Sequence, residues 1–266
     1  MTEPLTQFKH LRGRSAVILT PIYREPAAEY TQSLLGTIAA FQMLGIRCDL
    51  TQIVGDSILP RARNQLVARF LSSGAEDALF IDADMQWQPS DVLRLLSSDQ
   101  LMIGGACRRR LEMAESDPRS WCIRFKPDSG GRIKEDNRGA IEVEGAGLGF
   151  LRVSRRVFER LIAAHPDWKR PGTIFMTPPE REHYHRFFRF PDEDAEELGE
   201  DFFFCRAWRE LGGTAWIDPR LAIGHVGSKI YRGSVYALLH RAPSGPAPAQ
   251  ENDATASAVA SDAPPA

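Results

Sequence analysis

The feature that most constrains the fold of this chain is the regular alternation of strand-like and helix-like segments between residues 16 and 105. Short runs rich in β-branched and apolar residues predict strands, and the segments between them carry apolar residues at helical spacing. We expect strands at 16–20, 46–54, 78–82 and 101–105, and helices at 30–44, 60–73 and 91–98. This order predicts an α/β fold with a mixed, mainly parallel sheet flanked by helices. Such sheets bind ligands beyond the carboxyl ends of their strands.

The second half of the sequence is less regular but continues the same mixture. Strands are expected at 121–125, 140–145, 149–153, 214–218 and 221–225, and helices at 154–165 and 200–211. A long irregular segment, 165–198, is rich in Pro, His, Phe and Arg. Loops of that length in compact domains are usually functional or mobile, so we interpret 168–190 as an acceptor lid.

The ends of the chain differ in composition from the 13–240 region, which we expect to be one domain. Residues 1–12 are polar and are predicted to be a flexible N-terminal arm, without the apolar core of a signal peptide. Residues 241–266 are rich in Pro, Ala and Ser and have almost no large apolar side chains, which predicts a disordered tail.

Charge and cysteine usage narrow the classes of partner. The net charge of −2 gives no reason to expect nucleic acid. No apolar run approaches the roughly 20 residues of a membrane-spanning helix, although a lipid substrate would still bring peripheral membrane contact. The four cysteines are scattered, which predicts reduced thiols in a cytoplasmic protein, with neither a disulfide framework nor a zinc site.

The most informative acidic motif is Asp82-Ala83-Asp84, which ends the third predicted strand. Side chains two residues apart in extended chain share a face, with Cα atoms roughly 6.5 Å apart. Both carboxylates can therefore meet one hard cation that also binds substrate phosphates. Two solvated acids in a turn are the simpler alternative for so short a motif.

Other polar groups each have a structural and a functional interpretation. Glu200 and Asp201 begin a predicted helix, where acids oppose the helix dipole, but a carboxylate there also serves as a general base. His225 suits Mn²⁺ or is simply a hydrogen-bonded surface histidine. The glycines around Gly147 allow close backbone approach or form a plain turn. Arg63, near the start of a helix, favours phosphate or belongs to a solvated basic face.

Taken in order, these stretches resemble the GT-A glycosyltransferases, particularly the family-2-like enzymes. The matching stretches cover roughly residues 15–229: VILTPIYRE, ARNQLVARFL, LFIDADM, GAGLGFLRVSRRVFERL, GEDFFFCRAWRELGG and LAIGHVG. The resemblance implies the nucleotide-diphospho-sugar transferase-like GT-A fold. It also implies a hexosyltransferase-type activity that moves a sugar from a UDP- or GDP-sugar donor to a saccharide or glycolipid acceptor.

The resemblance also implies roles for particular residues. Thr20, Pro21 and Tyr23 would lie beside the nucleotide base and ribose, and Arg63 on the nucleotide side of the donor pocket. Asp82 would hold the ribose or a metal-bound water. Asp84 would be the main ligand of Mn²⁺ or Mg²⁺, with His225 completing the metal site. Gly147 would line the meeting point of donor and acceptor. Asp201 would be the base of an inverting reaction, and Glu200 would support the acceptor.

Two departures from the family pattern affect this assignment. The acid that usually contacts the base is represented by either Asp49 or Asp56. The segment 165–198 matches no known acceptor motif, and its His183 or His185 could supply an extra ligand.

Two other classes of function compete with transfer. A nucleotidyltransferase of similar fold usually carries a Gly-rich basic loop after its first strand, but TPIYREPAAEY has no Gly. A non-catalytic nucleotide- or saccharide-binding module would tolerate loss of an acid from either acidic pair, and both pairs are intact.

Overall fold

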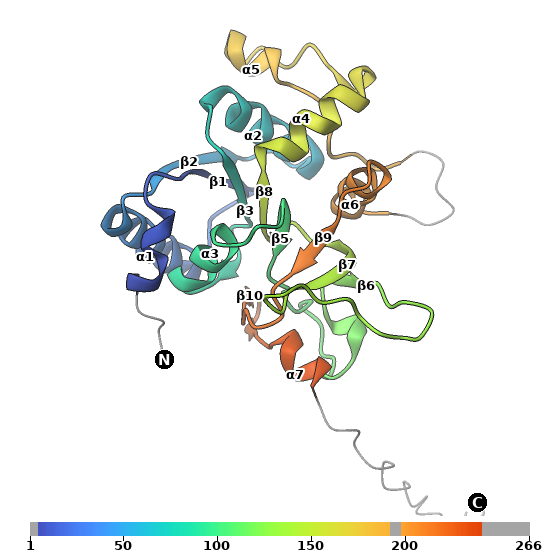
Figure 1. Cartoon of the computed structure of the whole chain (residues 1–266). Helices are drawn as coiled ribbons and strands as arrows, with labels where there is room; N and C mark the ends of the chain where they lie inside the picture. Colours follow the sequence, from blue (N-terminus) through green and yellow to red (C-terminus); the bar gives the residue numbers. More distant parts are fainter. Residues whose placement is uncertain (1–4, 192–197, 241–266) are drawn as a thin grey trace, which may run out of the picture.

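The computed structural model describes residues 5–191 and 198–240 as a mixed α/β fold built on an eight-stranded sheet (Figure 1). The strand order is β2-β1-β3-β8-β5-β9-β7-β6. Its strands are β1 (Ser15–Ile22), β2 (Arg47–Val54), β3 (Asp77–Ile81), β5 (Met102–Gly104), β6 (Ile123–Phe125), β7 (Ile141–Ala146), β8 (Phe150–Ser154) and β9 (Ala215–Ile217). The strand pairings show that all strands point in one direction except β7 and β8, which point the opposite way. This confirms the prediction of a mixed, mainly parallel sheet.

Helices cover both faces of the sheet, as the alternation predicts (Figure 1). They are α1 (Ala28–Leu44), α2 (Leu59–Ser73), α3 (Pro89–Leu96), α4 (Arg155–Ala164), α5 (Pro178–Glu182), α6 (Glu200–Glu210) and α7 (Val235–Leu239). Three short 3₁₀ helices are η1 (Leu5–Leu11), η2 (Pro118–Ser120) and η3 (Pro166–Trp168). Gly45 and Gly74 end α1 and α2 with φ of 71° and 75°, a left-handed conformation that glycine adopts without strain.

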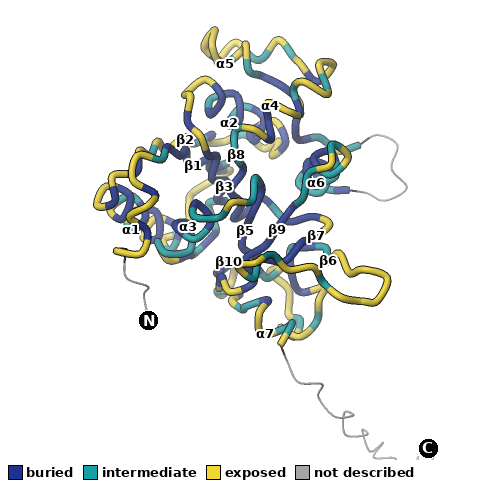
Figure 2. The backbone as a smooth tube through the Cα atoms, viewed as in Figure 1, coloured by how far each residue is buried: buried dark blue, intermediate teal, exposed yellow. Residues whose placement is uncertain are grey.

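Two hydrophobic cores result from the alternation of side chains along the central strands (Figure 2). Val17 and Leu19 pack with α2, α4 and α6, whereas Ala16 and Ile18 pack with α1, α3 and η1 on the opposite face. The second core corrects one prediction, because Phe8 of η1 is buried there. Residues 5–11 are therefore packed against the domain and are not part of a flexible arm. The predicted tail, 241–266, lies outside the described residues.

A second, three-stranded sheet was not predicted as a sheet, although the strand expected at 221–225 overlaps one of its strands. It has the order β11-β10-β4 and comprises β4 (Met85–Gln86), β10 (Gly224–Val226) and β11 (Ile230–Tyr231). Because β4 follows the Asp82–Asp84 motif directly, its pairing with β10 places His225 opposite Met85.

The predicted lid is anchored in the first core through its aromatic residues. Trp168, Phe187 and Phe188 are buried, and the Asn64 side chain forms hydrogen bonds with both the amide and the carbonyl of Phe188. The pair Ile174 and Phe175 is exposed instead, at 83% and 84%. Residues 192–197, near the end of the irregular segment 165–198, lie outside the described residues.

Candidate active site

The acidic motif lies at the carboxyl end of β3, between the two sheets. The Asp82 amide donates to the carbonyl of Gly149 at 3.0 Å, and the Val226 amide donates to the carbonyl of Asp84 at 2.8 Å. The loop is thus fixed from both sides by backbone hydrogen bonds. Both carboxylates are partly buried, with side-chain exposures of 26% for Asp82 and 32% for Asp84.

The Asp84 carboxylate meets His225 and Arg110. Its Oδ2 is 3.4 Å from Nε2 of His225 and 3.0 Å from Nη1 of Arg110. Its Oδ1 is buried and has no hydrogen-bond partner among the described residues. Burial alone would raise the Asp84 pKa, but His225 and Arg110 more than offset it, so the pKa lies below its ordinary value.

The imidazole of His225 is oriented by the backbone. Its Nδ1 donates to the carbonyl of Arg108 at 2.8 Å, which leaves Nε2 directed at Asp84. Burial lowers the His225 pKa, but the Asp84 carboxylate outweighs it and the pKa is raised overall. A histidine held by a backbone carbonyl through one nitrogen and facing a carboxylate with the other has the arrangement of a metal ligand.

Arg63 joins the acidic loop to the start of α6. The side chain is only 4% exposed, and its guanidinium donates to Glu200 Oε1 at 2.5 Å and to Asp82 Oδ2 at 3.1 Å. Burial would lower the Arg63 pKa, but Asp82, Glu200 and Asp201 outweigh it and keep the group charged. The structure therefore places Arg63 inside an ionic cluster, and not on the solvated basic face that was the structural alternative.

Asp201 and Glu200 occupy the first turn of α6 but differ in their partners. Glu200 is bonded to Arg63, whereas Asp201 Oδ1 accepts a hydrogen bond from the Phe202 amide at 2.8 Å. Burial raises the pKa of both carboxyls, against the effect of Arg63. A carboxylate with a raised pKa is a better proton acceptor at neutral pH, so Asp201 has the chemistry of a general base.

The glycine turn between β7 and β8 lines both acidic groups. A methyl group on Gly147 would lie 3.6 Å from Asp201 Oδ2, and one on Gly149 would lie 3.4 Å from Asp82 Oδ2. A larger side chain at either position would press against these carboxylates, so glycine lets the backbone approach the site closely.

The residues that were predicted to lie near the nucleotide differ in how far they are exposed to solvent. Thr20 is fully buried, and its hydroxyl lies 2.7 Å from that of Tyr30. Its side chain therefore packs inside the domain and is not exposed at the site. Pro21 is partly exposed, and Tyr23 is 63% exposed at the end of β1. Asp56, one of the two candidates for the acid that contacts the base, accepts a hydrogen bond from Arg61 Nε at 2.8 Å.

The two histidines proposed as extra ligands lie in the anchored segment. His185 is buried, and its Nδ1 donates to the His183 carbonyl. Burial lowers the pKa of both imidazoles, and neither belongs to the group of ligand atoms around His225.

Two cysteines next to His225 were missed by the sequence prediction. One ligand atom from each of Cys107, Cys122 and His225 lies within 4.8 Å of the other two, which contradicts the view of the cysteines as scattered. The Cys122 amide donates to the Cys107 carbonyl at 3.0 Å, and Arg108 faces Trp121 in the same ladder. Contact with Cys107 lowers the Cys122 pKa to about 7, whereas the pKa of Cys107 is raised.

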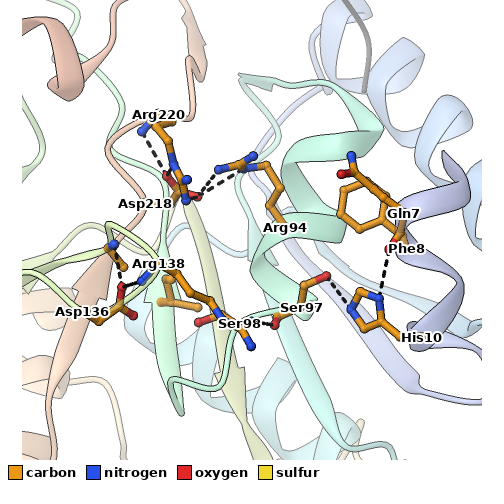
Figure 3. Close-up of a pocket in the computed structure, with 12 residues that line it drawn as sticks. Gln7, Phe8, His10, Arg94, Ser97, Ser98, Asp136, Arg138, Asp218 and Arg220 are labelled. Carbon is orange, nitrogen blue, oxygen red and sulfur yellow. Dashed lines mark hydrogen bonds and ion pairs between the residues drawn. The ribbon is translucent and has the colours of Figure 1, made fainter. Parts of the chain in front are cut away.

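A separate cavity of about 370 Å³ lies among η1, α3 and the segment around residue 138 (Figure 3). Its charged side chains pair with one another or with nearby groups. Asp218 accepts from both Arg94 and Arg220, and Arg138 pairs with Asp99. This cavity shares no lining residue with the acidic site, and its ion pairs favour a structural role.

The fold and the site define a mixed α/β protein with an acidic, histidine-containing centre at the carboxyl edge of its sheet. No family model matches the chain, and no curated protein matches it by sequence. Solved structures that are similar to it include the following two. A197 from STIV superimposes with a TM-score of 0.49 and 13% identity, covering 84% of this chain and 91% of that one. A glycosyltransferase involved in the glycosylation of the major capsid of PBCV-1 gives 0.31 and 10%, covering 64% and 72%.

Those scores are too low to indicate a function for this chain. Among the described residues, no helix has both the length and the apolar character that crossing a membrane requires.

Proposed function

We propose that this protein is a divalent-metal-dependent glycosyltransferase that uses a nucleotide-diphosphate sugar. The observation that carries the proposal is the Asp84 carboxylate, which faces His225 and keeps one buried oxygen without a hydrogen-bond partner among the described residues. A buried polar atom without a partner is costly, and a bound cation would satisfy it.

The residues present fit Mn²⁺ or Mg²⁺. Carboxylate oxygens of Asp84 and Asp82 and the imidazole of His225 are suitable ligands, and these ions usually bind one or two carboxylates together with substrate phosphates. The metal would stabilise the negative charge that develops on the departing nucleoside diphosphate.

The remaining residues bind, orient and move protons. Asp201 takes the proton from an acceptor hydroxyl of a saccharide or glycolipid, which attacks the sugar from the face opposite the leaving group and inverts the anomeric centre. Arg63 holds Glu200 and Asp82 together, and so fixes the start of α6 relative to β3. Gly147 leaves room for the reacting groups beside Asp201. Pro21 and Tyr23, at the end of β1, supply surface for the nucleotide base.

A donor screen tests this proposal. Hydrolysis of UDP- and GDP-sugars would be measured with Mn²⁺ for the wild type and for Asp84→Ala. We expect one donor to be hydrolysed and the variant to lose about 10²–10³-fold in rate, the effect of removing one electrostatic stabiliser. Asp99→Ala, an acid whose side chain is 81% exposed, is the matched control and should keep full activity.

Two results would contradict the proposal. Equal turnover by the wild type and Asp84→Ala would remove the metal from the mechanism. A metal-dependent rise in melting temperature with UDP or GDP, but no turnover with any donor or acceptor, would favour a nucleotide-binding module.

A further inference from the structure

The soft side chains next to the acidic site have no role in the proposed transfer reaction. Cys107 is buried, Cys122 is partly buried, and both thiols lie beside His225. The acidic ligands on one side of His225 suit hard cations such as Mn²⁺, whereas thiolates select softer ions such as Zn²⁺. His225 therefore stands between two ligand sets of different chemistry.

We propose that Cys107, Cys122 and His225 form a binding site for a thiophilic divalent cation, with Zn²⁺ as the best-fitting ion. Tetrahedral zinc with Zn–S bonds of about 2.3 Å and a Zn–N bond of about 2.0 Å separates its ligand atoms by about 3.5–3.8 Å. The three ligand atoms here lie within 4.8 Å of one another, so small side-chain movements complete that geometry.

The backbone holds the three ligands together before any ion binds. The Cys122 amide bonds to the Cys107 carbonyl, and the His225 ring bonds to the carbonyl of Arg108, the residue after Cys107. Cys107 also pairs with Ile223, two residues before His225. The ligands thus come from three neighbouring segments that are already hydrogen-bonded to one another.

The fourth coordination position of a tetrahedral ion at this site would lie next to Asp84. Its Oδ2 is 3.4 Å from His225 Nε2, close to the separation that two ligands of one tetrahedral ion adopt, and its Oδ1 is buried without a partner among the described residues. Binding releases the protons of the two thiols to solvent, and the ion neutralises the resulting thiolates. This site does not depend on the proposed transferase activity.

Cobalt spectroscopy tests the site without any need for turnover. The full chain, kept reduced, would be titrated with Co²⁺ and then with Zn²⁺. We expect a thiolate-to-cobalt charge-transfer band and tetrahedral d–d bands in the wild type, and their displacement by Zn²⁺. The charge-transfer band and the tetrahedral d–d bands should be lost in Cys122→Ser. They should be retained in Cys48→Ser, because Cys48 lies outside the cluster. A cobalt spectrum without a thiolate band, or a band that survives in Cys122→Ser, would overturn the proposal.

Alkylation of the wild-type protein gives a second measurement in case the cysteine variants do not fold. Zn²⁺ should slow the reaction of Cys122 with iodoacetamide and leave that of Cys48 unchanged, as measured by mass spectrometry. An unchanged rate at Cys122 would contradict the proposal. If the proposed transferase function also holds, Zn²⁺ should inhibit Mn²⁺-dependent turnover, and Cys122→Ser should resist that inhibition, because His225 belongs to both ligand sets.

Discussion

The two ends of β3 each carry a buried ionic cluster, but the clusters differ in how well their charges are matched. At the start, Asp77 is 1% exposed and both its oxygens accept from arginines, Oδ1 from Arg152 at 2.8 Å and Oδ2 from Arg14 at 2.5 Å. At the other end, Asp84 keeps a buried oxygen without a partner among the described residues, and Asp201 has a pKa raised by burial.

This difference separates a cluster with a structural role from the cluster that we propose to be the active site. The matched cluster fixes β1, β3 and β8 to one another, since Arg14 precedes β1 and Arg152 belongs to β8. The acidic end keeps carboxylates in excess of their cationic partners, which costs stability unless a ligand brings positive charge.

The largest effect is expected from Asp201→Asn at the acidic end. Loss of the general base should lower the transfer rate by about 10²–10⁴-fold. The same change should stabilise the fold at neutral pH, by up to about 2 kcal/mol. A raised folded-state pKa means that folding favours the protonated acid, so stability falls as pH rises from the unfolded pKa to the folded one.

Thermal unfolding and donor-acceptor assays would measure both effects, with Asp99→Asn as the control. A variant that retains activity within tenfold would remove Asp201 from catalysis.

The next largest effect is expected at the matched end of β3. Asp77→Ala leaves Arg152 buried without its carboxylate, which should cost about 3–5 kcal/mol of unfolding free energy. Urea denaturation would measure this loss, and Asp99→Ala should change stability by less than about 0.5 kcal/mol. A loss below about 1 kcal/mol would mean that the cluster at this end is as loosely matched as the acidic one.

The smallest effect is expected in the pH dependence of kcat/KM, which reports the pKa values of the essential groups in the free enzyme. The proposed mechanism requires ionised Asp201, so activity should fall as pH drops through the pKa of that residue. Because burial raises that pKa, the acid limb should lie above the value of about 3.9 for an exposed aspartate. An acid limb at or below that value would show that Asp201 titrates as a solvated acid.

The sequence predicted the elements that carry the site because each has a strong local signal. Gly45 and Gly74 end helices where expected, and the apolar run before Asp82 is a fully buried strand. The meeting of Asp84 with His225 was predicted only through the family resemblance.

Other features depend on tertiary pairing and have little local signal. The two-residue strand β4 is too short for periodicity to detect, and the strand expected at 221–225 only overlaps β10. Cys107 and Cys122 lie on segments that pair only in the folded chain, so their spacing resembles no metal motif. Arg63 looked like a phosphate ligand because only the fold brings Glu200 to it.

The pairing of β4 with β10 has a consequence for biosynthesis. Asp84 is made early and His225 late, near the end of the described chain, so a ribosome-bound chain lacks one of the proposed ligands until β10 has emerged. A fragment that ends at residue 223 would retain all eight strands of the large sheet but would lack this histidine. High-affinity cation binding should therefore be possible only after the last strands of the domain have been synthesised.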